Sequence, residues 1–253
     1  MLNYVTYGTP GAQPPLLIVH GLFGSARNWG VIARRLSEDR VVIAVDMRNH
    51  GDSRWDAAHG YEDLAADLAA VIRAHGGRAD LLGHSMGGKA VMQLALTQGA
   101  LVRRLVVADI APVAYGHSQR HLVEAMQALE LEGLSLRSEA DRRLALSVPG
   151  EGVRAFLLQS LDLKATPARW KLNLAALGAE MDRITGWPGT PGQFDGPALF
   201  IAGAASDYVR PEHHAIIRAQ FPAAEFAEIE GAGHWLHADR PREFEALVKA
   251  FLA

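Results

Sequence analysis

The chain has 253 residues, 49% of them hydrophobic, and its 25 basic and 28 acidic side chains give a net charge of −3. This composition is sufficient for one large α/β domain and excludes a general electrostatic attraction to nucleic acid or to an anionic membrane surface. The absence of cysteine excludes disulfides and thiolate catalysis. Because the sequence starts without the basic and apolar regions of a signal peptide and has no apolar run of about 20 residues, we expect a cytoplasmic protein without a membrane span.

Short apolar runs, most of them rich in β-branched residues, predict strands, most of them buried on both faces and the last more alternating. In chain order they are residues 16–19, 41–45, 80–82, 105–108, 198–201 and 225–229. Between them lie amphipathic helical patterns at 61–74 and 211–220, and a final helix is expected over 241–252. This alternation of strand and helix predicts a mostly parallel, doubly wound sheet.

The alternation stops in the middle of the chain. Helical patterns at 121–131, 140–146, 153–161 and 170–184 follow one another there without a convincing strand, and a Pro- and Gly-rich loop at 187–192 ends the interruption. We therefore expect residues 1–112 and 197–253 to form an α/β core and residues 113–196 to form an inserted helical cap.

The stretch Gly83-His84-Ser85-Met86-Gly87 spells G-x-S-x-G between an expected strand and a helical pattern. In this setting the motif predicts a serine nucleophile on a sharp strand-to-helix turn, where glycines let the strand and the helix approach closely. Extended to Gly88 and Lys89, the stretch also matches the spacing of a phosphate-binding loop, but Ala90 lacks the hydroxyl that such a loop offers to magnesium. We interpret Ser85 as a nucleophile.

A serine nucleophile needs a base, and His234 is the best candidate in this sequence. It follows Gly231-Ala232-Gly233, after the last expected strand and before the final helix. A neutral imidazole there would take the hydroxyl proton and later return it to the leaving group.

The negative charge that develops during acyl transfer needs backbone amides as donors. One is expected from Met86, the residue after the nucleophile, where the helix dipole also favours negative charge. The second is expected from Leu22 in the glycine-containing stretch 20–25 that follows the first expected strand, with Phe23 as the alternative donor.

The stretch 46–53 contains aspartate, arginine and histidine around a glycine. Short polar side chains bond to nearby backbone in such loops, so we interpret it as structural rather than as a second acid–base site.

Taken together, these motifs resemble the α/β-hydrolase superfamily and closely resemble the bacterial YbfF-type esterases. The resemblance spans nearly the whole chain and rests on residues 20–25, 46–53, 83–88, 109–113 and 231–239. It implies an α/β-hydrolase fold, activity on short acyl esters and, as a second substrate class, on acyl-coenzyme A thioesters.

Two aspartates, Asp109 and Asp207, are the main candidates for the acid that orients His234. The superfamily usually has G-x-x-D after a late strand, but here Ser206 occupies the last position of that pattern and Asp207 comes one residue later. Either Asp109 or Asp207 preserves the chain order serine, acid, histidine, and either strand end could deliver a carboxylate to the imidazole. The YbfF-type resemblance favours Asp109, and Asp182 in the cap is a weaker alternative because a cap helix is a less rigid support.

The sequence therefore predicts a serine hydrolase that cleaves carboxylic esters through an acyl-enzyme on Ser85. Its partner is a small ester or thioester, it needs no metal or organic cofactor, and we expect a monomer or a small homo-oligomer. The same fold also carries lyases, haloperoxidases, carbon–carbon hydrolases and ligand receptors, which are the alternative functions.

Overall fold

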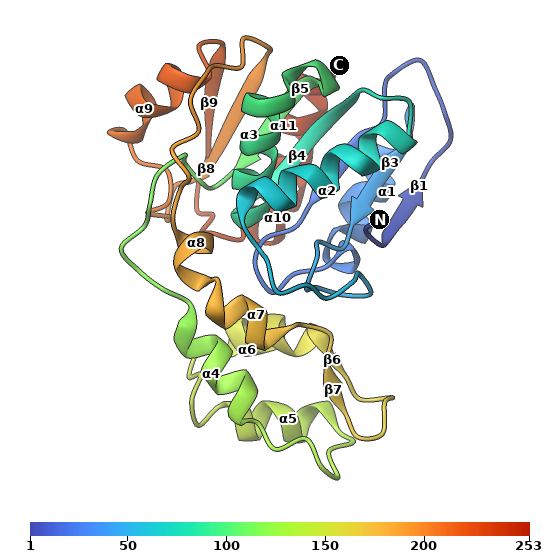
Figure 1. Ribbon diagram of the computed structural model, residues 1–253, viewed down its shortest axis with the longest axis vertical. Coiled ribbons are helices and arrows are strands. Elements are labelled where there is room, and N and C mark those ends of the chain that lie inside the picture. The colour runs from blue at the N-terminus through green and yellow to red at the C-terminus, as the bar shows by residue number, and fades with distance from the viewer.

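The computed structural model describes residues 1–253 and is built on a seven-stranded sheet with the order β1-β3-β2-β4-β5-β8-β9 (Figure 1). All neighbouring strands are parallel except β1 and β3. The strands are β1 Tyr4–Tyr7, β2 Leu16–Val19, β3 Val42–Val45, β4 Ala79–His84, β5 Val102–Ala108, β8 Ala198–Gly203 and β9 Ala224–Ile229. The expected doubly wound, mostly parallel sheet is confirmed.

Helices cover both faces of the sheet, because alternate strand residues point to opposite sides. Residues such as Leu17 and Leu81 join a 53-residue apolar cluster with α2 Tyr61–Ala74, α3 Met86–Gln98 and α9 His213–Gln220. Their neighbours Leu16 and Leu82 join a 20-residue cluster on the other face, with α1 Gly30–Leu36, α10 Leu236–Asp239 and α11 Pro241–Leu252. The sheet is thus the middle layer of three.

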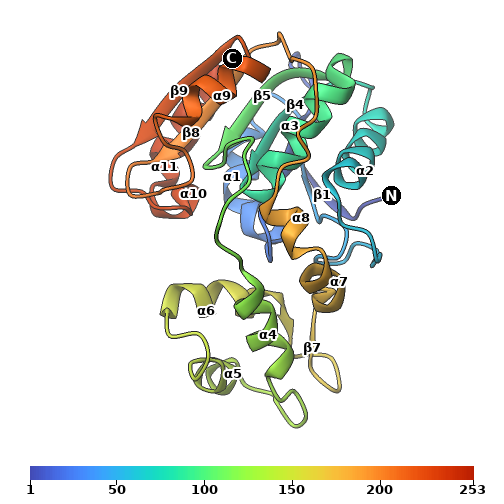
Figure 2. The same cartoon turned by 60° about the vertical axis from the view of Figure 1, so that its left-hand side comes forward.

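The segment between β5 and β8 lies beyond the sheet, where Figures 1 and 2 both show its elements gathered below the carboxyl ends of the strands. It contains α4 Arg120–Ala128, α5 Arg137–Leu144, α6 Glu151–Leu157, β6 Leu161–Asp162, β7 Arg169–Trp170, α7 Leu174–Ala179 and α8 Met181–Thr185. Three short 3₁₀ helices complete the chain: η1 Ala26–Trp29, η2 Gly99–Leu101 and η3 Leu158–Ser160. No helix combines the length and the apolarity needed to cross a bilayer.

Helix α1 was not expected from the sequence, and two features built from strands also differ from the sequence-based expectation. The segment 113–196 contains the hairpin β6–β7, in which Trp170 pairs with Leu161, so helix begins at Leu174 rather than at residue 170. The edge strand β1 was also not predicted, since its residues are half-buried or exposed and it forms by pairing with β3. Both are held by partners that short hydrophobic patterns do not reveal.

A buried ion cluster closes the end of the sheet opposite the segment between β5 and β8. Asp80, in β4, is fully buried and accepts hydrogen bonds from Arg40 at 2.7 Å and from Arg103 at 2.6 and 2.8 Å. Both guanidinium groups also donate to the carbonyl of Leu252, at 3.1 and 3.0 Å. The cluster therefore joins β4, β5 and the final helix.

We expect Asp80→Ala to lower the free energy of unfolding by about 3–5 kcal/mol, because it leaves two arginines without their buried counter-ion. Urea denaturation of wild type and variant measures the difference. Arg142→Ala is the control, since that side chain is 78% exposed, and it should leave stability nearly unchanged. Equal stability of the Asp80 variant and the control would contradict a structural role for the cluster.

Candidate active site

Ser85 sits alone between the end of β4 and the start of α3, in a left-handed backbone conformation with φ 53° and ψ −120°. This conformation costs a non-glycine residue about 1–3 kcal/mol, so the surroundings must impose it. A side chain at Gly83 would collide with the carbonyl of Gly87, and one at Gly87 would collide with the carbonyls at the end of β2. The glycines therefore allow strand and helix to close tightly on the serine.

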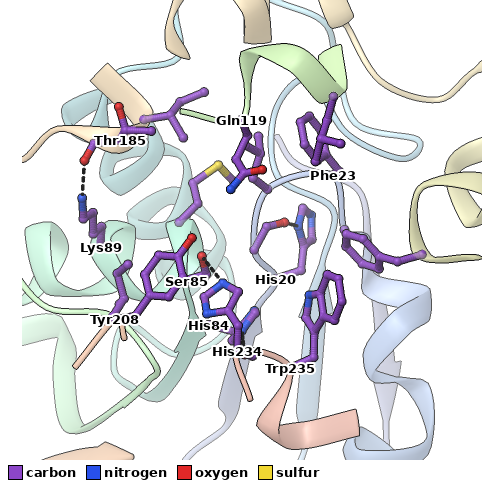
Figure 3. Close-up of a pocket in the computed structure, with 18 of the residues that line it drawn as sticks. His20, Phe23, His84, Ser85, Lys89, Gln119, Thr185, Tyr208, His234 and Trp235 are labelled. Atoms are coloured by element: carbon purple, nitrogen blue, oxygen red, sulfur yellow. Dashed lines mark hydrogen bonds between the residues drawn. The ribbon is translucent and has the colours of Figure 1, made fainter. Parts of the chain in front are cut away.

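His234 lies between Ser85 and Asp109, and Figure 3 shows it beside Ser85. Its Nε2 is 3.0 Å from Ser85 Oγ, and its Nδ1 is 2.7 Å from Asp109 Oδ2. Because an ionised carboxylate only accepts hydrogen bonds, Nδ1 carries the proton and donates to Asp109. Nε2 is then free to accept the Ser85 hydroxyl proton, which is the arrangement needed for general-base activation of a serine.

Asp109 is fully buried directly after β5 and also has a left-handed backbone, with φ 52°. Its Oδ1 accepts the amide of Gly203 at 3.1 Å, and its Oδ2 accepts the hydroxyl of Ser206 as well as His234 Nδ1. The serine that stands in the G-x-x-D position thus donates to the carboxylate that contacts the histidine. Ser206 was not identified as a site residue from the sequence, although its place in that pattern was the available signal.

The two alternative acids lie elsewhere. The Asp207 side chain is 94% exposed and faces Arg210 at 3.9 Å, and the Asp182 side chain is 90% exposed beside Arg120. Neither carboxylate contacts His234: the loop after β8 turns Ser206 inward and Asp207 outward, and Asp182 lies on α8. The structure brings Asp109 to the histidine and leaves Asp207 and Asp182 in solvent.

The expected donors to an oxyanion lie next to Ser85. A side chain at Gly21 would come within 3.2 Å of Ser85 Cβ, so the loop after β2 packs directly on the serine. Within this loop the amide of Phe23 is occupied, since it donates to His50 Nε2 at 3.1 Å, whereas the amide of Leu22 donates to no group of the chain. Met86 opens α3, where a helix leaves its first amides without an internal partner.

A largely apolar pocket of about 300 Å³ opens onto Ser85 and His234. Side chains of the core and of the segment 113–196 line it together, among them Leu22, Trp29, Ile110, Leu122, Phe156 and Ile184. Because both parts of the chain form its wall, the pocket depends on the segment between β5 and β8 packing against the core.

Two contacts of His234, one with an aromatic ring and one a hydrogen bond, could not be read from the sequence. The Tyr208 ring stacks on the imidazole with centroids 4.0 Å apart, and its hydroxyl is 2.7 Å from His117 Nε2. His84, within the G-x-S-x-G motif, donates from Nε2 to the backbone carbonyl of His234 at 2.8 Å. Since these contacts join residues far apart in the chain, no local pattern signals them.

Lys89 is a buried cation without an acidic partner. Its Nζ donates to the carbonyl of Thr185 at 3.0 Å and to the carbonyl of Gly186, at the end of α8. Burial lowers the pKa of Lys89 to about 7. The side chain thereby joins the end of α8 to the helix that follows Ser85.

Three kinds of comparison with known proteins agree. The profile of the alpha/beta hydrolase family matches residues 16–247. Esterase YbfF of Escherichia coli K12 is 40% identical over 94% of this chain and 92% of its own, and the sn-1-specific diacylglycerol lipase ABHD11 of Mus musculus is 38% identical over 100% of this chain and 85% of its own. A solved marine microorganism esterase superposes with a TM-score of 0.94 at 33% identity, covering 99% of this chain and 98% of its own.

Four buried histidines surround the site, and burial lowers the pKa of each: His20, His50, His59 and His84. For His59 the pKa falls to about 3, with the positive charge of Arg48 as a smaller cause. Its Nδ1 accepts the side-chain amide of Asn49 at 3.2 Å, which leaves the proton on Nε2, near Met86 Sδ. These histidines are therefore neutral hydrogen-bonding groups at neutral pH.

The free energy of unfolding should decrease as the pH falls below 6.5, because His59 in the unfolded chain then binds a proton. In the folded chain His59 binds this proton only at about pH 3. One such proton gives a slope of about 1.4 kcal/mol per pH unit within that window. His59→Gln should remove this contribution from the slope, as measured by urea denaturation between about pH 4 and 6. His121→Gln, at an exposed position, is the control; an unchanged slope in the His59 variant would refute the assignment.

Proposed function

Because this chain belongs to the alpha/beta hydrolase family and is a carboxylic ester hydrolase, we propose that it cleaves its substrates through an acyl-enzyme on Ser85. The resemblance to YbfF-type esterases is confirmed by 40% identity to Esterase YbfF. The observation that carries the proposal is the position of His234, within 3.0 Å of Ser85 Oγ and 2.7 Å of Asp109 Oδ2.

The first half of the proposed reaction forms the acyl-enzyme. Ser85 Oγ attacks the ester carbonyl carbon while His234 Nε2 takes the hydroxyl proton. The carbonyl oxygen becomes an oxyanion, which accepts hydrogen bonds from the amides of Leu22 and Met86. When the tetrahedral intermediate collapses, the bond to the alkoxy oxygen breaks, and His234 returns the proton to the departing alcohol.

The second half releases the acid. A water molecule attacks the acyl carbon and gives one proton to His234, and the imidazolium then protonates Ser85 Oγ as the acyl–oxygen bond breaks. Asp109 stays ionised throughout, holding Nδ1–H in place and stabilising the imidazolium. Its bonds from Gly203 and Ser206 support this role by fixing the carboxylate.

The pocket supports short acyl chains as substrates. At about 300 Å³ it lies at the small end of ligand pockets, and its wall is mostly apolar. We propose that residues 113–196 act as a cap over a core formed by 1–112 and 197–253, and that the cap sets the length of chain accepted. Acyl-coenzyme A thioesters are the second proposed class, since attack by serine and proton return by histidine serve both leaving groups.

We expect Ser85→Ala to lower kcat on a short-chain p-nitrophenyl ester by at least about 10⁴-fold, because no other group can form the acyl-enzyme. The variant should also lose covalent labelling by a fluorophosphonate, read by intact mass. Ser138→Ala, on the exposed surface of α5, is the matched control and should keep both activities. Turnover without labelling, or labelling of the alanine variant, would refute Ser85 as the nucleophile.

Asp109→Asn should lower kcat by about 10⁴-fold, because an amide no longer holds the required imidazole tautomer. Asp207→Asn should change kcat little, since its carboxylate lies in solvent. Steady-state kinetics of the pair compares two chemically identical substitutions. A larger loss at residue 207 would reassign the acid.

A further inference from the structure

The loop of residues 46–53, interpreted from the sequence as structural, contacts the loop of residues 20–25 beside Ser85. We propose that His50 is a positioning residue that holds this oxyanion loop, so that the free Leu22 amide faces the reacting carbonyl oxygen. The inference rests on the proposed function, because it assigns a support to one of the oxyanion donors.

The His50 ring is completely buried and held by two backbone groups. Its Nε2 accepts the amide of Phe23 at 3.1 Å, and its Nδ1 lies 2.9 Å from the carbonyl of Arg48. An amide can only donate and a carbonyl can only accept, so the ring is neutral with its proton on Nδ1. Only this tautomer satisfies both partners.

Phe23 is the point at which the loop needs such support. Its backbone is left-handed, with φ 65°, which is a costly conformation for a non-glycine residue, and its side chain is 3% exposed. Because the Phe23 amide donates to His50, it is not available to a group bound in the pocket. The Leu22 amide remains without a partner, one residue from Gly21, which packs on Ser85.

A second histidine, His20, forms two hydrogen bonds at the start of the same loop. His20 Nε2 accepts the amide of Met47 at 2.9 Å, and its Nδ1 lies 2.8 Å from the carbonyl of Gly21. The rings of His20 and His50 lie 5.0 Å apart. The oxyanion loop is thus joined to residues 46–53 on both sides of Leu22.

Near its hairpin β6–β7, the segment 113–196 forms hydrogen bonds with both the loop of residues 20–25 and the loop of residues 46–53. Ser160, just before β6, donates its hydroxyl to the carbonyl of Phe23 at 3.0 Å. After β7, Leu172 forms a backbone bridge with His50, and the amide of Asn173 donates to the carbonyl of Asn49 at 3.0 Å. A shift of this segment would therefore also displace the oxyanion loop, because hydrogen bonds join the two.

This arrangement predicts a loss in transition-state stabilisation rather than in substrate binding. His50→Phe keeps an aromatic ring but removes the acceptor, and it should lower kcat by about 10- to 100-fold with little change in KM. The inhibition constant of a short alkyl trifluoromethyl ketone, whose Ser85 adduct carries an oxyanion, should rise by a similar factor. His50→Gln offers an oxygen near the former Nε2 and should recover most of the lost kcat.

The control is His75→Phe, a half-buried histidine at the end of α2 whose ring contacts Tyr4, and it should leave kcat unchanged. Ser160→Ala removes the other bond to Phe23 and should produce a smaller loss in kcat of the same kind. Circular dichroism checks the fold of each variant, and if His50→Phe does not fold, His50→Gln and Ser160→Ala carry the test.

Wild-type kcat in folded His50→Phe would overturn the inference, as would a raised KM with unchanged kcat. If His50→Phe does not fold, a Ser160→Ala variant with wild-type kcat and inhibitor affinity would overturn it. These outcomes leave the proposed function intact as long as Ser85→Ala is inactive. An active Ser85→Ala would instead refute the proposed function itself.

Discussion

The site depends on left-handed backbone turns at the carboxyl ends of neighbouring parallel strands. All the non-glycine residues with positive φ in the chain lie there: Phe23 after β2, Asn49 after β3, Ser85 after β4 and Asp109 after β5. Each turn costs about 1–3 kcal/mol and persists only where its surroundings leave no alternative. Packing of the sheet between two helical layers supplies that constraint, and the turns in return direct a hydroxyl, a carboxylate and backbone amides toward one point.

The polar groups around this point are satisfied almost entirely by one another and by backbone. Asp109 accepts from Gly203, Ser206 and His234, and His50 and His20 bond only to main-chain groups. Burial keeps the supporting histidines neutral, so each has one tautomer and one orientation. A preorganised set of this kind needs no reorganisation as charge develops on the substrate, which is the main electrostatic advantage of an enclosed site.

The segment between β5 and β8 is connected to the same machinery at several places. Lys89 and Tyr61 bind carbonyls at the end of α8, Ser160 binds Phe23, and Tyr208 reaches His117 from its position on His234. The wall of the pocket is therefore attached to the helix that follows Ser85, to the loop of residues 20–25 and to the Tyr208 ring that stacks on His234. Substitutions far from Ser85 in this segment can change turnover because these contacts transmit small displacements to the reacting groups.

The sequence by itself determined the elements that local chemistry specifies. Buried runs of β-branched residues defined the parallel strands, and the spacing of glycines around Ser85 and before His234 located both side chains at turns after strands. The sequence left Asp109 and Asp207 as alternatives, with the family resemblance favouring Asp109. The tertiary structure places only the Asp109 carboxylate against His234, because the loop after β8 turns Ser206 inward and Asp207 outward. It also determined β1, the β6–β7 hairpin, the stacking of Tyr208 on His234 and the contacts of residues 46–53 with residues 20–25. Each of these depends on partners distant in the chain, whose approach is set by packing rather than by local sequence pattern.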